Sequence, residues 1–233
     1  MVEDLKLSSV KRKTLSQQVS EQIIMLITEG RLKPGDRLPS ELDLIDQFGV
    51  SRPVLREALS SLETLEILSR SPRGGTYINK RVGSSPYQAM LAISINNIPA
   101  VIEARMALEL GLVTIAAEKI TDTHLKQLEK SIEGIRKYAE QDYGKYDKEF
   151  HRIIAYSVDN PILEGMIESL LIAHNKTNSL IPFREPKKTI NDHKAIYEAL
   201  KKRDSAKAFK EMYKHLSYVQ EKILKFSKED IDH

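Results

Sequence analysis

The sequence predicts a mainly α-helical protein, in which an N-terminal winged helix-turn-helix domain is followed by an all-helical bundle of about six helices. Two observations predict this fold class. Glycine, proline and β-forming residues lie close together before residue 80, whereas apolar residues recur at three-to-four spacing from Tyr87 onward. Between these regions, NKRVGSSP (79–86) has the polar, Gly/Ser/Pro-rich composition of a linker. We therefore expect a domain over 1–79, a linker over 80–85 and a second domain over 86–233.

The composition is that of a soluble globular protein, with 41% hydrophobic and 30% charged residues among 233. A chain of this length can bury a core in each of two domains. The net charge is only +3, so a nucleic-acid role must rest on where the charges lie. Cysteine is absent, which excludes disulfides and thiolate metal sites. Because no apolar run has signal-peptide or membrane-spanning length, we expect a cytoplasmic protein without membrane association.

Two helices are expected at the start of the first domain. Apolar residues at helical spacing over 15–27 predict an amphipathic helix that ends at Gly30. After the turn-rich segment LKPGDRLPS, Ser40 and Asp43 have the spacing of a capping box. They predict the start of a short second helix, which Gly49 ends.

A third helix and a hairpin complete the first domain. Ser51 can cap the helix, and Pro53 lies in its first turn, where the missing N–H costs nothing. Two short β-like runs follow, ILSRS and TYIN, and the segment PRGG joins them as in a hairpin. This order of helices, turn and hairpin is that of a winged helix-turn-helix.

The start of the third helix carries the residues that we expect to contact DNA. In a helix-turn-helix, the N-terminal residues of the recognition helix reach base edges in the major groove. Ser51, Arg52, Pro53, Val54 and Arg56 are the exposed positions there, while Leu55 points inward. The two arginines lie one turn apart, so each can bind a guanine. Ser51 can also donate to a phosphate. The alternative is that both arginines are only solvated, which the surrounding order of elements makes less favourable.

The hairpin tip, Arg73-Gly74-Gly75, is a second expected contact with DNA. Glycine brings no Cβ, so the backbone can approach the duplex closely. Arg73 can then enter the minor groove.

The second domain is helical throughout in this interpretation. Apolar residues recur at three-to-four spacing, and there is no glycine-rich phosphate loop or dinucleotide fingerprint. The expected helices span residues 86–96, 98–119, 121–140, 142–158, 160–181 and 189–227, the last being broken near 203–205.

Two histidines lie at equal distances from the expected break in the last helix. His193 precedes Asp204 by eleven residues, and His215 follows it by eleven. If the two helical segments pack antiparallel, both imidazoles lie at the same height, roughly 16 Å from the turn at a rise of about 1.5 Å per residue. Each histidine also lies on an apolar helical face, so we expect the two to face each other across a core.

Asp147 and His151 form a second polar pair, one turn apart on a helical face that Phe150 and Ile154 make apolar. One carboxylate and three imidazoles form a nitrogen-and-oxygen set suited to zinc, the preferred ion, or to nickel, manganese or iron. A metal ion would also remove the cost of burying the carboxylate. The alternative is that each of these residues is an isolated core polar group satisfied by hydrogen bonds.

Residues 14–79 include GRLKPGDRLPSELDLIDQFGVSRPVLREALSSLETLEIL followed by RGGTYI. This segment resembles the DNA-binding domain of the GntR family of bacterial transcription regulators. The resemblance implies base and phosphate contacts by Ser51, Arg52, Pro53 and Arg56 and by the wing residues Gly74 and Gly75. One departure is Leu42, because many members have a DNA-contacting arginine after the glutamate of LPSE. A leucine cannot replace that contact, so the operator sequence cannot be taken from relatives.

Three further segments are VIEARMALELGLVTIAA, YDKEFHRIIAYSVDNPIL and DHKAIYEALKKRDSAKAFKEMYKHL. They resemble the FCD ligand-binding domain, the effector module of the FadR-like branch of GntR regulators, over about residues 86–225. The resemblance implies that the metal ligands are Asp147, His151, His193 and His215. It also matches Arg105 to an arginine that is common in the family and could pair with a carboxylate effector. The alternative for Arg105 is an intrahelical pair with Glu109 at i+4.

These features predict a homodimeric transcription regulator, a repressor by analogy with the family, that is not an enzyme. Two-fold symmetry would present two recognition helices to a palindromic operator on double-stranded DNA. A small carboxylate effector bound at the metal would change DNA affinity by binding one arrangement of the helical domain better than another. Two alternatives stay open: a metal-dependent hydrolase or oxygenase, since such a site can activate water, and a regulator with a purely structural metal. No second acid or base is evident beside the site, which argues against the enzyme.

Overall fold

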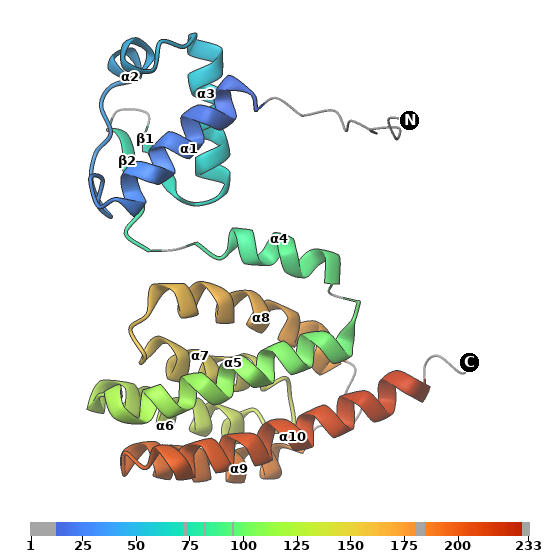
Figure 1. Ribbon diagram of the computed structural model, residues 1–233. Coiled ribbons are helices and arrows are strands. Elements are labelled where there is room, and N and C mark those ends of the chain that lie inside the picture. Colours follow the sequence, from blue (N-terminus) through green and yellow to red (C-terminus); the bar gives the residue numbers. More distant parts are fainter. Residues whose placement is uncertain (1–12, 72–73, 82, 95, 180–184, 230–233) are drawn as a thin grey trace, which may run out of the picture. The chain divides into compact units, whose positions relative to one another are not determined.

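The structure, a computed structural model, describes residues 13–71, 74–81, 83–94, 96–179 and 185–229 (Figure 1). The chain divides into two compact units, Met1–Gly83 and Ser84–His233. Both units are mainly helical, and the strands found in the described ranges form one two-stranded hairpin in the first unit. The predicted fold class, a winged helix-turn-helix followed by a helical domain, is therefore confirmed. Residue 82 of the predicted linker, and residues 95 and 180–181 of the predicted helices, lie outside the described ranges.

The described part of the first unit has three helices and a hairpin in the predicted order. The elements are α1 (Leu15–Thr28), α2 (Glu41–Phe48), α3 (Arg52–Thr64), β1 (Leu68–Ser71) and β2 (Gly75–Ile78). At the start of α2, the Asp43 N–H donates to Ser40 Oγ, and the Ser40 N–H donates to the Asp43 carboxylate, both at 3.2 Å. The predicted capping box is confirmed. Gly49 then ends α2 in the left-handed conformation, with φ of 62°.

The inner face of α3 forms the centre of this unit's core. Leu55, Leu59 and Leu62 are fully buried and recur at helical spacing, and they share one apolar cluster with Val19 and Ile23 of α1. Burying these three leucines stabilises the folded state by on the order of several kcal/mol. Their burial therefore fixes the rotation of α3 about its axis. The polar face of α3, including the arginines at its start, is therefore left in solvent.

The hairpin packs against the same core and is tied to α3. Its strands pair antiparallel, with Leu68 opposite Ile78, and both of these side chains are buried. Arg70 of β1 donates from Nε to the Glu63 carboxylate of α3 at 2.8 Å. The wing is thus held to the recognition helix by apolar burial and by an ion pair.

The second unit is helical throughout its described part. Its helices are α4 (Ser85–Ser94), α5 (Ile98–Lys119), α6 (Asp122–Lys137), α7 (Gly144–Tyr156), α8 (Pro161–Ser179), α9 (Pro186–Lys201) and α10 (Ser205–Glu229). Their ends agree with the predicted spans to within about three residues. The largest difference at a helix start is in α9, which begins at Pro186 rather than at residue 189. A proline suits the first turn of a helix, where its missing N–H is not needed.

The predicted break in the last helix is the turn that joins α9 to α10. Arg203 adopts a left-handed φ of 54° there. Its guanidinium donates to the carbonyls of Glu118 at 2.7 Å and Ile120 at 2.9 Å, which anchors the turn to the end of α5. Asp204 Oδ1 accepts the Lys207 N–H at 2.9 Å and caps α10. The chain therefore reverses, and α9 and α10 pack side by side (Figure 1).

The core of the second unit forms around α5, which packs against α7, α8, α9 and α10. Among the fully buried residues are Val113, Phe150, Ile196, Leu200 and Met212. None of the helices in the described ranges is both long and apolar enough to cross a membrane. This core also contains buried polar residues, including His151, His193 and His215.

Candidate metal centre and nucleic-acid interface

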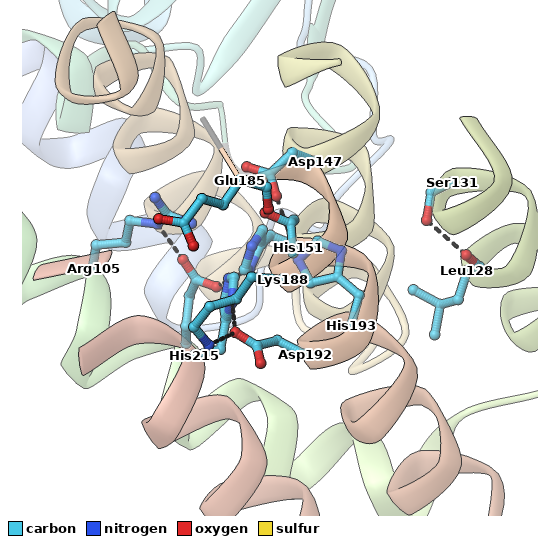
Figure 2. A network of polar contacts seen from close by, with 12 residues as sticks. Arg105, Leu128, Ser131, Asp147, His151, Glu185, Lys188, Asp192, His193 and His215 are labelled. Atoms are coloured by element: carbon cyan, nitrogen blue, oxygen red, sulfur yellow. Dashed lines mark hydrogen bonds and ion pairs between the residues drawn. The ribbon is translucent and has the colours of Figure 1, made fainter. Parts of the chain in front are cut away.

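Four buried polar side chains converge inside the second unit (Figure 2). Asp147 and His151 lie one turn apart on α7, while His193 comes from α9 and His215 from α10. Their exposed fractions are 7%, 2%, 0% and 4% in that order. Each residue offers one ligand atom, and these atoms all lie within 4.8 Å of one another. The sequence-based expectation that these residues come together is met by the geometry.

The three imidazoles lie close to one another around the carboxylate. The ring centroids of His193 and His215 are 4.9 Å apart, as expected for residues at equal distances from the α9–α10 turn. The His151 ring is 5.3 Å from each of the other two. His193 Nε2 lies 3.4 Å from Asp147 Oδ1. This spacing leaves room for an ion among the ligand atoms.

A carboxylate on α5 contacts His151 from outside the cluster. Glu109, only 3% exposed, hydrogen-bonds through Oε2 to His151 Nδ1 and accepts the Nε–H of Arg105 at Oε1. Burial raises the pKa of the Glu109 carboxyl, but the contacts with Arg105 and His151 outweigh burial and hold that pKa below its usual range. Glu109 is therefore an ionised carboxylate in the middle of a helical core.

A second carboxylate, on α9, contacts His215. Asp192 Oδ2 lies 3.4 Å from His215 Nδ1 and 2.7 Å from Lys188 Nζ (Figure 2). Burial raises the pKa of Asp192, but the His215 and Lys188 contacts prevail and lower it to about 2. The Asp192 carboxyl is thus ionised at neutral pH.

The protonation states of the histidines suit metal binding. Burial, followed by the nearby His215, lowers the pKa of His193 well below its ordinary value. Burial also lowers the pKa of His215. Both rings are consequently neutral at physiological pH, which is the form that coordinates metals.

The donor set and the hydrogen bonding of His193 both fit a metal ion. His193 is fully buried, and within the described part of the chain neither of its ring nitrogens makes a well-aligned hydrogen bond, despite the 3.4 Å approach of Asp147. A buried imidazole in this situation costs free energy unless something binds its lone pair. A divalent cation would do so, and one carboxylate with three imidazoles is a familiar ligand set for such ions. The cluster could therefore hold a metal ion.

Arg105 forms the intrahelical pair with Glu109 that the sequence left open as an alternative. Its side chain is only 9% exposed and pairs with Glu109 one turn later on α5. The bond uses Nε, whereas a guanidinium has four further N–H donors on its terminal nitrogens. Beside Arg105 is a hollow of only about 20 Å³, lined mainly by apolar residues such as Ile102 and Leu216. The intrahelical pair is present, and it does not involve the N–H donors on the terminal nitrogens of the guanidinium.

The contacts of Glu109 and Asp192 with the histidines were not predicted from the sequence. A signal for Glu109 existed, because it is an acid inside the otherwise apolar stretch MALELGLVTIAA. Asp192 has a weaker signal, because a single acid on a polar stretch of a helix is expected to be solvated. Their contacts join residues 42 and 23 positions apart, which helical periodicity alone does not predict.

The start of α3 presents the polar residues predicted to contact DNA. Ser51, Arg52, Pro53 and Arg56 are all exposed. Ser51 occupies the N-cap position, but its hydroxyl makes no capping hydrogen bond, so the expected side-chain cap is wrong. Pro53 in the first turn already supplies a preformed φ and lacks an N–H to cap. Leu42, on the neighbouring α2, is 62% exposed.

The wing glycines are partly buried at the tip of the hairpin, and Arg73 lies outside the described residues. Gly74 accepts a hydrogen bond from the Tyr77 hydroxyl at its carbonyl, at 2.8 Å. Gly75 has φ of 100°, and a Cβ there would lie 2.8 Å from Arg37 Nε. Glycine at position 75 therefore allows both the left-handed turn and the close approach of an exposed guanidinium.

Comparison with known protein families identifies both units. Residues 15–78 match the family described as bacterial regulatory proteins, gntR family, and residues 100–218 match the FCD domain. The chain is 57% identical over 224 residues to YcbG of Bacillus subtilis (strain 168), an uncharacterized HTH-type transcriptional regulator, with 96% of each chain covered. It is 31% identical to the HTH-type transcriptional repressor NanR of Cronobacter sakazakii, covering 89% of this chain and 85% of that protein.

A solved structure shows the same architecture. The Streptococcus agalactiae GntR structure is 25% identical and superimposes with a TM-score of 0.64, covering 88% of this chain and 99% of that one. The matched families consist of transcription regulators rather than enzymes, which removes the hydrolase and oxygenase alternatives. The chain therefore belongs to the GntR family, in the FadR-like branch that pairs a helix-turn-helix DNA-binding unit with an FCD domain, and it is a transcription regulator.

Proposed function

We propose that the protein is a homodimeric, metal-containing repressor whose affinity for its operator is controlled by a small organic acid bound in the FCD domain. The observation that carries this proposal is the buried Asp147, His151, His193 and His215 cluster. A helical core gains nothing in stability from three imidazoles and a carboxylate at its centre, because burying polar groups costs free energy unless they are bound. A regulatory site explains why they are there.

Zinc is the ion that we propose for the cluster, with nickel, manganese and iron as the other candidates. Asp147 would supply a carboxylate oxygen, and His151, His193 and His215 would each supply a ring nitrogen. These donors suit borderline divalent ions. With the cation bound, a coordination position left open by the protein could accept a carboxylate oxygen.

Arg105 is the residue that we propose for the charge of the effector. It lies on α5, and Glu109 connects it to the ligand His151. Its terminal N–H groups can bind a carboxylate in bidentate fashion while Nε stays with Glu109. A small carboxylic acid, rather than a cation or an apolar molecule, fits this combination of a guanidinium and a metal-binding cluster.

DNA binding is proposed at the start of α3 and at the wing. Arg52 and Arg56 would contact base edges, while Ser51 and Pro53 approach the phosphates. Arg73, Gly74 and Gly75 would reach the adjacent groove. A dimer would present two such surfaces to a palindromic operator, and the Cronobacter relative described as a repressor supports that sign of regulation.

The test combines thermal shift with DNA binding. Purified protein, either loaded with zinc or treated with a chelator, is screened against small carboxylic acids, because a ligand that binds only the folded state raises its melting temperature. We expect one class of acids to stabilise the zinc form alone and to weaken binding to the upstream DNA. If acids act equally well after chelation, the metal is structural and the effector binds elsewhere. If no acid changes either stability or DNA binding, the proposed effector is wrong.

A further inference from the structure

Two of the proposed metal ligands share a feature that the other ligands lack. His151 and His215 each have a carboxylate oxygen within hydrogen-bond distance of Nδ1, from Glu109 on α5 and from Asp192 on α9. Neither carboxylate belongs to the cluster of ligand atoms. We propose that Glu109 and Asp192 are positioning residues that fix Nε2 of His151 and of His215 as the metal-binding atom. This inference rests on the metal site of the proposed function.

The chemistry of the imidazole gives each carboxylate this effect. A neutral imidazole has one N–H and one lone pair, and the hydrogen bond at one nitrogen decides which nitrogen carries the proton. A carboxylate that is paired with a cation, as Glu109 is with Arg105 and Asp192 with Lys188, accepts hydrogen bonds, so the proton belongs on Nδ1 of each ring. The lone pair is then on Nε2, which is available to the cation. Each carboxylate also increases the basicity of its histidine as a ligand.

Each carboxylate is in turn held by a cation of its own. Arg105 donates from Nε to Glu109, one turn away on α5. Lys188 lies 2.7 Å from Asp192, also one turn away, on α9. An ion pair keeps the carboxylate ionised and restricts its rotamers, so the acceptor stays aimed at the histidine. Two separate series of contacts, each made of a cation, a carboxylate and an imidazole, therefore lead into the cluster. Figure 2 shows the one formed by Lys188, Asp192 and His215.

His193 is held by ring stacking rather than by a carboxylate outside the cluster, so the proposed positioning role applies to His151 and His215. Its ring stacks on Phe150 with centroids 3.8 Å apart and planes 9° from parallel. Both residues are fully buried. Packing, rather than a carboxylate, therefore fixes the orientation of His193, and its Nε2 is the nitrogen that lies near Asp147.

The two positioning residues should not have equal effects. Glu109 is 3% exposed at its side chain and makes a close contact with His151. Asp192 is 10% exposed and lies 3.4 Å from His215, at the long end of hydrogen-bond distances. Loss of a partner of this kind typically weakens metal binding by about 10- to 100-fold. We expect Glu109 to lie toward the upper end of that range and Asp192 toward the lower end.

The test measures zinc affinity in the full-length protein by competition with a chromogenic chelator. The variants are Glu109→Ala, Glu109→Gln and Asp192→Asn. The matched control is Glu129→Gln, because Glu129 is also a carboxylate that accepts a side-chain hydrogen bond, from the Tyr197 hydroxyl, but lies outside the cluster. We expect affinity to fall in Glu109→Ala and to recover partly in Glu109→Gln, which keeps an acceptor oxygen. The control should match the wild type.

A second readout separates positioning from general stability. Imidazole nitrogen NMR of the zinc-loaded protein should show His151 and His215 protonated at Nδ1 and coordinated through Nε2. If Glu109→Gln does not fold because Arg105 is left buried without its partner, the Arg105→Gln, Glu109→Gln double variant removes both charges and is measured instead. Unchanged zinc affinity in the variants, or coordination through Nδ1, would overturn this inference alone. A wild-type protein that binds no zinc would overturn the proposed metal site as well.

Discussion

Replacing two of the proposed metal ligands should abolish the stabilisation of the FCD domain that we expect from zinc. In the His193→Ala, His215→Ala variant, two of the three imidazoles at the centre of the cluster are lost. The remaining Asp147 and His151 both come from α7, so they cannot join that helix to α9 or α10. We expect the wild type to melt at a higher temperature with zinc than with chelator, and the variant to melt at the same temperature in both.

The size of the effect follows from linkage. An ion that binds only the folded state adds about 2.7 kcal/mol to the free energy of unfolding when its free concentration is about 100 times its Kd. For a unit the size of Ser84–His233, each kcal/mol raises the Tm by about 2–4 °C. Zinc at that concentration should therefore raise the Tm of the second unit by about 5–11 °C.

Calorimetry is the assay, because two units can unfold in separate transitions. Chelated variant protein gives the baseline, which accounts for the cost of the cavities that the two alanines leave. The matched control is His124→Gln, since His124 is a half-buried histidine of α6 outside the cluster. If the double variant keeps the full zinc-dependent shift, zinc binds somewhere else and the assignment of the ligands is wrong.

Three further predictions concern DNA binding and pH. Arg52→Ala and Arg56→Ala should each weaken specific binding to the upstream DNA by roughly 5- to 150-fold, which corresponds to a loss of about 1–3 kcal/mol. The melting temperature should not change, because both side chains are exposed. Binding titrations that match the wild type would contradict the assignment. Gly75→Ala should weaken DNA binding while leaving the helical circular dichroism intact, because an alanine is strained at φ of 100° and the tip of the wing must change conformation. An unchanged affinity would show that the wing does not contribute. In chelated protein, the pKa of His193 is lowered in the folded state, so below about pH 6.5 the unfolded chain binds a proton that the folded chain does not. The free energy of unfolding should therefore fall as the pH decreases, by up to about 1.4 kcal/mol per pH unit for that group. Urea denaturation between about pH 5 and 8 measures this slope, and a His193→Gln variant with the same slope would show that other groups cause it.

Local signals in the sequence were enough to predict the elements of the DNA-binding unit. The Ser40 and Asp43 capping box and the helix-ending Gly49 act over a few residues, and the structure uses them as expected. The side-chain cap at Ser51 failed because a residue type that suits an N-cap does not ensure that its hydroxyl turns toward the helix. Propensity identifies where a helix begins more reliably than it identifies which atoms bond there.

The core of the metal site was also predictable, for a geometric reason. His193 and His215 lie eleven residues on either side of Asp204, and a tight antiparallel pair of helices brings such positions level. The contacts of Glu109 and Asp192 could not be predicted from the sequence in this way, because they depend on how α5 and α9 are rotated about their axes relative to the histidines. Periodicity gives the buried face of a helix to within about one residue, whereas a hydrogen bond depends on side-chain positions within a fraction of an ångström.

The distribution of the ligands over helices explains how a small molecule could act on this domain. Asp147 and His151 belong to α7, His193 to α9 and His215 to α10, and α5 contributes Glu109 from outside. The packing of these helices around the cluster therefore depends on which atoms the ligand residues bind. Close-packed interiors shift between discrete arrangements rather than deforming continuously, so a carboxylate that enters the cluster would favour one arrangement of the helices. An effector changes the regulator's DNA affinity only to the extent that it binds that arrangement more tightly than the other, and a coupling of about 1–3 kcal/mol would change operator affinity by about 5- to 150-fold.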